Sequence, residues 1–199
     1  MSSEPLATKV INGFTVNIRP DCTPLDPLED GLTRIMYKRT SRYTLGNEPA
    51  TPEEMNETER RKDIVWRPVY AYVHSSAHIS TNPGIATCPF DSGQSGLCYV
   101  TYDQIRECFG VKRISKKLKA EIYNKVLPGE VGLYSKYLNG ECYGWEVLNS
   151  KGDVVESCYG YYDDDEFEYL FEEAKAAIGD RCDDPEVEDL VPTLATECA

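Results

Sequence analysis

Residues 142–159, CYGWEVLNSKGDVVESCY, carry the pattern that decides the fold class. Aromatic and β-branched residues in 142–148 and 154–159 flank the polar segment Asn149-Ser150-Lys151-Gly152-Asp153. Aromatic and β-branched residues favour strands, and a short segment rich in Asn, Gly and Asp between two strands favours a turn. We therefore expect an antiparallel hairpin here.

Other segments upstream share this strand-forming composition. The expected strands are 10–18 (a single strand or a hairpin), 32–37, 64–74 and 96–100. Pro68 cannot donate a hydrogen bond to a neighbouring strand, so part of the third segment is expected to be an edge strand or a bulge.

Helix signals lie between and after these strands. Thr51 and Thr101 are each followed three residues later by Glu or Gln, the spacing of a capping box. The expected helices are 51–62, 103–109, 111–127, 130–138 and 164–178, with a break at Pro128-Gly129. The strands alternate with segregated helices and no βαβ unit repeats, so the predicted class is α+β: a mainly antiparallel sheet with packed helices and an acidic C-terminal helix and tail.

The chain of 199 residues is 41% hydrophobic, enough to build a core. We expect an irregular N-terminal segment with one short helix (1–63) packed on an α+β core domain (64–178), and an acidic tail (179–199). No apolar run is long enough to span a bilayer, and the first residues lack the basic and apolar regions of a signal peptide. A cytoplasmic protein is expected.

The negative charge is concentrated at one end. The formal charge is −13, and residues 161–199 hold fourteen acidic and two basic residues. Two interpretations stay open: a solvated, solubilising end, or a surface that imitates nucleic-acid phosphates and occupies a partner that binds DNA or RNA. The acidic candidates for such a surface are Asp163, Asp164, Asp165 and Glu166.

Residues 111–127 have the opposite charge, with six basic residues against one glutamate. Apolar residues recur there every three or four positions, which places the lysines on the other face of an amphipathic helix. That face is an ordinary exposed surface, a contact for nucleic acid or an acidic partner, or a docking site for the acidic tail. Given the net charge, direct nucleic-acid binding is not expected.

The eight cysteines include no C-x-x-C pair, and the chain has two histidines, His74 and His78. Without a secretory signal, reduced thiols are expected, most of them buried as small hydrophobic residues. No metal site and no cofactor are predicted.

The segment 74–96 is polar and turn-forming between two expected strands, where binding residues are often displayed. Its end, Cys88-Pro89-Phe90-Asp91-Ser92-Gly93-Gln94-Ser95-Gly96, resembles a family of uncharacterised phage and plasmid proteins with the pattern cysteine-proline-aromatic-Asp-Ser-Gly-Gln. The likeness continues through 110–117, 129–140, 143–145 and 156–160. Phe90 stands where many relatives have Trp, and Ser76 replaces a glycine. The resemblance implies a phage-like setting in a bacterial host and supplies no activity.

Three interpretations of this segment stay open. His74, Asp91 and Ser92 would suit a general base, its orienting acid and a nucleophile, with Gln94 donating to an oxyanion. The same four residues could instead bind a ligand or a partner. Asp-Ser-Gly-Gln before a strand is also typical of a hydrogen-bonded structural turn.

The favoured hypothesis is a non-enzymatic phage accessory protein that binds and inhibits a host or defence protein, with nucleic-acid mimicry by the acidic end as one version. The alternative is a binder or hydrolase of a small molecule or nucleotide, centred on the 74–94 loop. A third hypothesis is a nucleic-acid-binding module that uses the basic helix.

Overall fold

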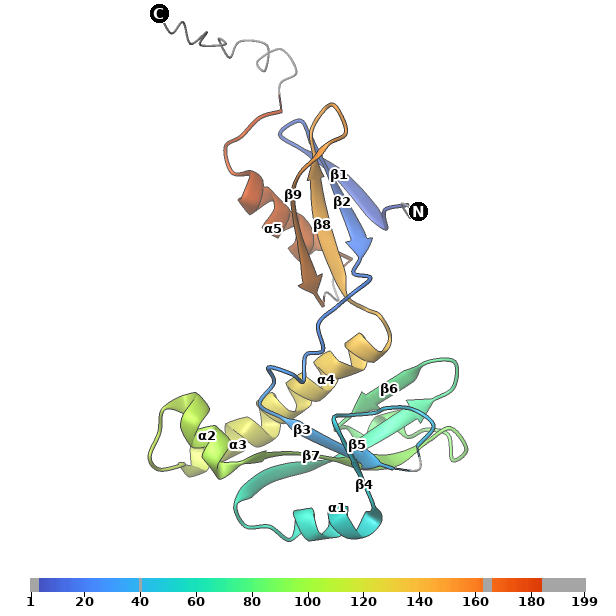
Figure 1. Cartoon of the computed structure of the whole chain (residues 1–199), viewed down its shortest axis with the longest axis vertical. Coiled ribbons are helices and arrows are strands. Elements are labelled where there is room, and N and C mark those ends of the chain that lie inside the picture. The colour runs from blue at the N-terminus through green and yellow to red at the C-terminus, as the bar shows by residue number, and fades with distance from the viewer. Residues whose placement is uncertain (1–3, 40, 163–165, 184–199) are drawn as a thin grey trace, which may run out of the picture. The chain divides into compact units, whose positions relative to one another are not determined.

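The computed structural model describes residues 4–39, 41–162 and 166–183, which form two compact units. In the terminal unit, described residues before Thr23 pack with those from Cys142 onward. The central unit runs from Thr23 to Glu141. Each unit contains a mostly antiparallel sheet with packed helices, which confirms the predicted α+β class (Figure 1).

The terminal unit is built around two hairpins: the one at 142–159 was predicted, and for 10–18, where a single strand or a hairpin was expected, the structure has the hairpin. Its sheet has the antiparallel order β1-β2-β8-β9. Asn12 and Gly13 take positive φ angles of 52° and 89° in the tight turn between the first two strands. The elements are β1 Ala7–Ile11, β2 Phe14–Pro20, β8 Tyr143–Leu148, β9 Val154–Tyr161 and α5 Glu168–Ile178.

The core of the terminal unit lies between its sheet and α5. Val16 and Ile18 from β2 and Val147 from β8 are fully buried against Leu170 and Ala174 of the helix. The predicted helix 164–178 therefore exists and packs as expected, but it begins at Glu168. Residues 166 and 167 take positive φ angles of 50° and 68°, which a continuous right-handed helix does not allow. Residues 163–165 lie outside the described part of the chain.

The central unit contains a five-stranded sheet of order β4-β3-β7-β5-β6. Only the β3–β4 pair is parallel. Pro68 lies on the part of β5 that pairs with β7 alone, next to a register shift at Val69/Tyr70, so the expected edge and bulge are both present. The strands are β3 Arg34–Lys38, β4 Glu48–Ala50, β5 Ile64–Val73, β6 Ala77–Ser80 and β7 Ser92–Thr101.

Helices cover both faces of this sheet. The first, α1 Pro52–Glu59, packs on Met36 and Leu97, and its capping box with Thr51 is formed as predicted. On the other face lie α2 Tyr102–Phe109, α3 Lys116–Glu121, the π-helical turn η2 Ile122–Val126 and α4 Leu127–Leu138. Among the described residues, no helix combines the length and apolar composition needed to cross a membrane.

The predicted break at Pro128-Gly129 is wrong, because α3, η2 and α4 form one continuous helical rod. The widened π-helical turn lies directly before Pro128, and the Leu127 N–H bonds the carbonyl of Ile122, five residues back. A proline has no N–H to donate, and in a regular helix its ring would crowd the carbonyl four residues earlier. The wider turn accommodates both effects.

Two other expectations differ from the structure. The segment 74–96 contains β6, the short 3₁₀ turn η1 Pro83–Ile85 and the beginning of β7. In β6, buried Ala77 and Ile79 alternate with exposed His78, which is the pattern of a strand. The expected irregular segment 1–63 contains four strands and α1. Its boundary at residue 63 does not coincide with the division between the units, because β2 pairs with β8, more than a hundred residues away.

Candidate functional site

Residues 88–92 form a closed turn at the start of β7. The Ser92 hydroxyl donates to the Cys88 carbonyl at 2.5 Å and accepts the Cys88 N–H at 2.9 Å, while the Ser92 N–H donates to the same carbonyl at 2.9 Å. The Cys88 thiol donates to Asp91 Oδ2 at 3.6 Å, and the Asp91 carbonyl accepts the Val73 N–H at 2.7 Å. The polar groups of Asp91 and Ser92 thus hold the turn itself.

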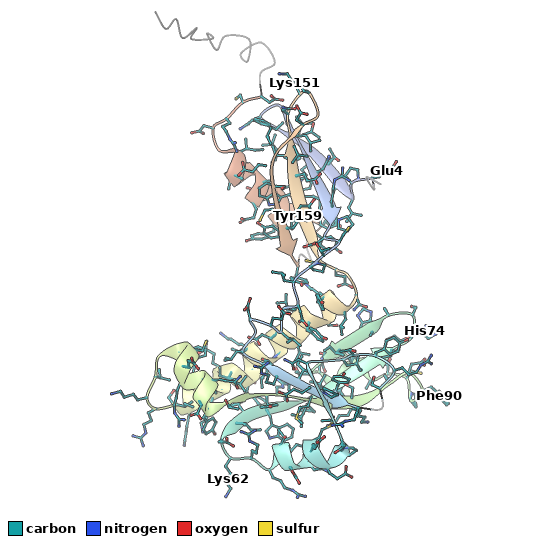
Figure 2. All side chains as sticks on the ribbon, in the orientation of Figure 1. Glu4, Lys62, His74, Phe90, Lys151 and Tyr159 are labelled. Atoms are coloured by element: carbon teal, nitrogen blue, oxygen red, sulfur yellow. The ribbon has the colours of Figure 1, made fainter. Side chains whose placement is uncertain are left out.

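Phe90 lies at the apex of this turn, and its side chain is 96% exposed. Figure 2 shows the ring at the same end of the central unit as His74. The backbone on either side is anchored through Cys88, Ser92 and Asp91, so the ring is presented to solvent from a fixed position. Fully burying a Phe side chain gains about 1.5–3 kcal/mol. A partner with a matching pocket would recover that energy without first ordering the turn.

An open depression of about 290 Å³ lies beside Phe90. Three of the predicted site residues, Asp91, Ser92 and Gln94, line it. Lys38 at the end of β3 also lines it, and within the described chain the side chains of Lys38 and Gln94 make no hydrogen bond. The full lining is Lys38, Ser41, Leu45, Ala71, Val73, Phe90, Asp91, Ser92, Gly93, Gln94 and Ser95.

The fourth predicted residue, His74, does not join this cluster. It lies exposed in the turn between β5 and β6, and its ring makes no hydrogen bond to any described residue. The Ser92 hydroxyl, the candidate nucleophile of the catalytic interpretation, already donates its proton to a carbonyl. A nucleophile needs its base within hydrogen-bonding distance, and this arrangement does not place His74 there.

A serine–histidine contact between other residues was not anticipated from the sequence. Ser76 Oγ lies 3.0 Å from His78 Nε2, and Asn139 Nδ2 lies 3.2 Å from His78 Nδ1. The Asn139 amide also donates to the carbonyls of Ser135 and Ala77, at 2.7 and 3.2 Å, so its NH₂ group and not its oxygen faces the imidazole. These contacts tie β6 to the end of α4.

Of the acidic candidates, the structure describes Glu166 alone, which belongs to the terminal unit. Asp163, Asp164 and Asp165 are outside the described residues, and Glu166 precedes α5. Along the exposed side of α5, Glu168 pairs with Lys9 at 2.7 Å and Glu172 with Lys175 at 3.5 Å. Part of the acidic charge on this helix is therefore compensated locally by exposed ion pairs, each of which contributes little to stability.

The seven described cysteines are free thiols. The expectation that most are buried is wrong: Cys98 and Cys142 are buried, Cys88 is intermediate, and the other four are exposed. Burial raises the pKa of Cys98 to about 12, so this thiol stays protonated. Within the described residues, no group of three or more His, Cys, Asp or Glu side chains is placed to hold a metal ion.

Comparisons with protein-family models, with curated proteins and with solved structures found no match for this chain.

Proposed function

We propose that this protein acts by binding another protein rather than by catalysis, and that the 88–92 turn carries the contact. The observation behind the proposal is the pairing of a nearly fully exposed Phe90 with a turn closed by three hydrogen bonds. Aromatic side chains dominate the energy of many protein interfaces, and a contact held in its bound shape loses little entropy on binding. Lys38 and Gln94, beside the ring, offer polar contacts at its rim.

The partner is a protein of a bacterial host or of a defence system, and occupation of its surface inhibits it. The likeness of the 88–96 motif to phage and plasmid proteins supports this setting. Nucleic-acid mimicry by the acidic end is the version in which the partner normally binds DNA or RNA. The segments of the chain assigned to the terminal unit have a net charge of −14, which supports that version.

The test is a quantitative pull-down from bacterial lysate with three tagged full-length proteins: the wild type, Phe90→Ala and Leu25→Ala. Leu25 is the matched control, since it is another large apolar side chain of the central unit and is 81% exposed. A true partner is retained by the wild type and by Leu25→Ala. Its recovery with Phe90→Ala falls by about tenfold or more, as for an interface hot spot.

The purified partner is then titrated against the same three proteins by calorimetry. The proposal fails if no protein depends on Phe90, or if Leu25→Ala loses the same protein equally.

The mimicry version needs its own truncation, after Asp183. Removal of residues 161–199 would also delete α5, whose Leu170 and Ala174 complete the core of the terminal unit. If the protein truncated after Asp183 still binds its partner fully, the last sixteen residues take no part in mimicry.

The alternative of a small-molecule or nucleotide site keeps one supporting observation, the depression that Lys38 and Gln94 line. Its test is titration of the full-length protein with nucleoside mono- and triphosphates, with Lys38→Ala as the variant. Hydrolysis is tested separately by product release, with Ser92→Ala and His74→Ala as the variants that a catalytic mechanism requires to be inactive.

A further inference from the structure

Four basic side chains gather in the loop after α2 and in the first turn of α3. They are Lys112, Arg113, Lys116 and Lys117, and all four are exposed. We call these four residues the basic surface. α2 and α3 lie at the opposite end of the central unit from Phe90 (Figures 1 and 2), so the basic surface is separate from the proposed protein contact.

None of the four forms an ion pair with another described residue. Other cations at this end of the unit do have partners: Arg106 pairs with Asp103 at 2.6 Å, and Lys119 donates to the Tyr102 hydroxyl at 2.5 Å and lies 4.1 Å from the centre of its ring. Cations without a local partner keep their full charge available for a ligand. The basic surface comprises four of the six cations of the positive segment 111–127.

The net charge of the whole chain does not describe this surface. The central unit contains 16 basic and 15 acidic residues, a net charge of +1, and the excess of acid belongs to the rest of the chain. Exposed charges more than about 8–10 Å apart are largely screened at physiological salt. A ligand at the basic surface therefore responds mainly to the charges within that distance, which include Glu121 as well as the four cations, and the expectation against nucleic acid, which was based on total charge, does not decide local binding.

Two partly exposed aromatic side chains lie on the same helical elements that flank and carry these cations. Phe109 ends α2 directly before the loop and is 41% exposed, and Tyr123 is 42% exposed. Tyr123 follows Lys116 by seven residues on the same helical rod, which places both on similar sides of it. The Arg67 guanidinium lies 4.5 Å from the centre of the Tyr123 ring and donates to its carbonyl at 3.0 Å, which fixes this part of the rod.

We infer that the basic surface binds single-stranded nucleic acid, with its cations on the phosphates and Phe109 and Tyr123 stacking on bases. Unspecific single-strand binding combines such cations with aromatic rings, because every base has a face on which a ring can stack. The lysines and arginine follow the backbone and carry no base specificity. This inference does not depend on the proposed function, which uses the other end of the unit.

The experiment is fluorescence anisotropy with the full-length protein and a labelled single-stranded DNA of about 16 nucleotides, the upper end of the site sizes that single-strand-binding OB folds cover. Four neutralised phosphates give a slope of log affinity against log salt of about −2.8. An increase from about 50 to about 200 mM salt should therefore weaken binding about 50-fold.

The test variant is Lys116→Glu/Lys117→Glu. With two fewer phosphates neutralised, the slope becomes shallower by about 1.4, and affinity at about 50 mM salt falls about 60-fold. The matched control is Arg60→Glu/Lys62→Glu, which changes the total charge equally at two other exposed residues of the central unit and should leave the slope unchanged. Phe109→Ala should weaken binding at least about fivefold with the slope intact.

Four results would overturn the inference. They are no binding at the lowest salt, equal losses in the charge variant and its control, tighter binding to the matching duplex, and competition by polyglutamate as effective as that by DNA of the same charge. Circular dichroism of each variant excludes unfolding as the cause of a loss.

Discussion

Replacement of Ser92 by alanine separates a structural role of its hydroxyl from a catalytic one. The substitution removes the bond from Ser92 Oγ to the Cys88 carbonyl and the bond from the Cys88 N–H to Ser92 Oγ. A typical intramolecular hydrogen bond contributes about 0.5–1.5 kcal/mol net. Both residues are partly exposed, so water replaces some of the loss, and we expect a destabilisation of about 1–2 kcal/mol.

Urea unfolding measures this difference when the signal comes from the central unit alone. The protein has Trp66 in the central unit and Trp145 in the terminal unit, so the series is made in a Trp145→Phe background. Ser95→Ala is the matched control. It lies in the same strand and gives up a single hydrogen bond, from Ser95 Oγ to the Val69 carbonyl at 3.2 Å, so it should lose about half as much.

Hydrogen exchange gives a second readout, because the amide of Cys88 loses its acceptor in Ser92→Ala and should exchange faster, while Ser95→Ala leaves it protected. Unchanged stability together with unchanged exchange at residue 88 would refute the reasoning. Full stability combined with the loss of a hydrolytic activity would assign the hydroxyl to catalysis.

Three further changes test the fold of the central unit. Gly96→Ala should destabilise it by about 3 kcal/mol in urea unfolding, because the new Cβ would clash with the Met36 carbonyl oxygen and separate β3 from β7. Wild-type stability would contradict the pairing. Thr101→Ala should cost about 1 kcal/mol by loss of the N-cap of α2, and a loss of α2 protection in hydrogen exchange checks that the effect is local. Burial and the nearby Glu48 carboxylate raise the pKa of Tyr99 to about 12, above the unfolded value of 10. The contribution of the protonated Tyr99 hydroxyl to the free energy of unfolding is therefore complete below pH 10 and is lost between pH 10 and 12. Between about pH 9 and about pH 11, the urea midpoint should fall less in Tyr99→Phe than in the wild type. Equal falls in the two proteins would contradict this assignment.

Features that depend on neighbouring residues in the sequence could be predicted closely. Both capping boxes, at Thr51 and Thr101, form as expected, because their hydrogen bonds join atoms three residues apart. The hairpin at 142–159 forms for the same reason, since its turn brings adjacent strands together. The inward residues of α5 follow from helical spacing alone.

The candidate site could be predicted in part. The sequence indicated the 74–96 segment, and Asp91, Ser92 and Gln94 do line one depression. That His74 is not among the residues lining the depression depends on the length and register of β5 and β6, which composition does not reveal. The exposure of Phe90 was not foreseen either, because an aromatic residue between a proline and an aspartate fits a buried turn equally well.

The sequence alone determined the class of the fold, the positions of its caps and turns, and the segregation of charge, all of which depend on residues within a few positions of one another. Only the tertiary structure decided that β2 pairs with β8 and that the rod continues through Pro128. It also decided that the Ser92 hydroxyl is bound within its own turn. These outcomes depend on which distant surfaces pack together, and the free energy of packing is a property of the whole arrangement and not of any single segment.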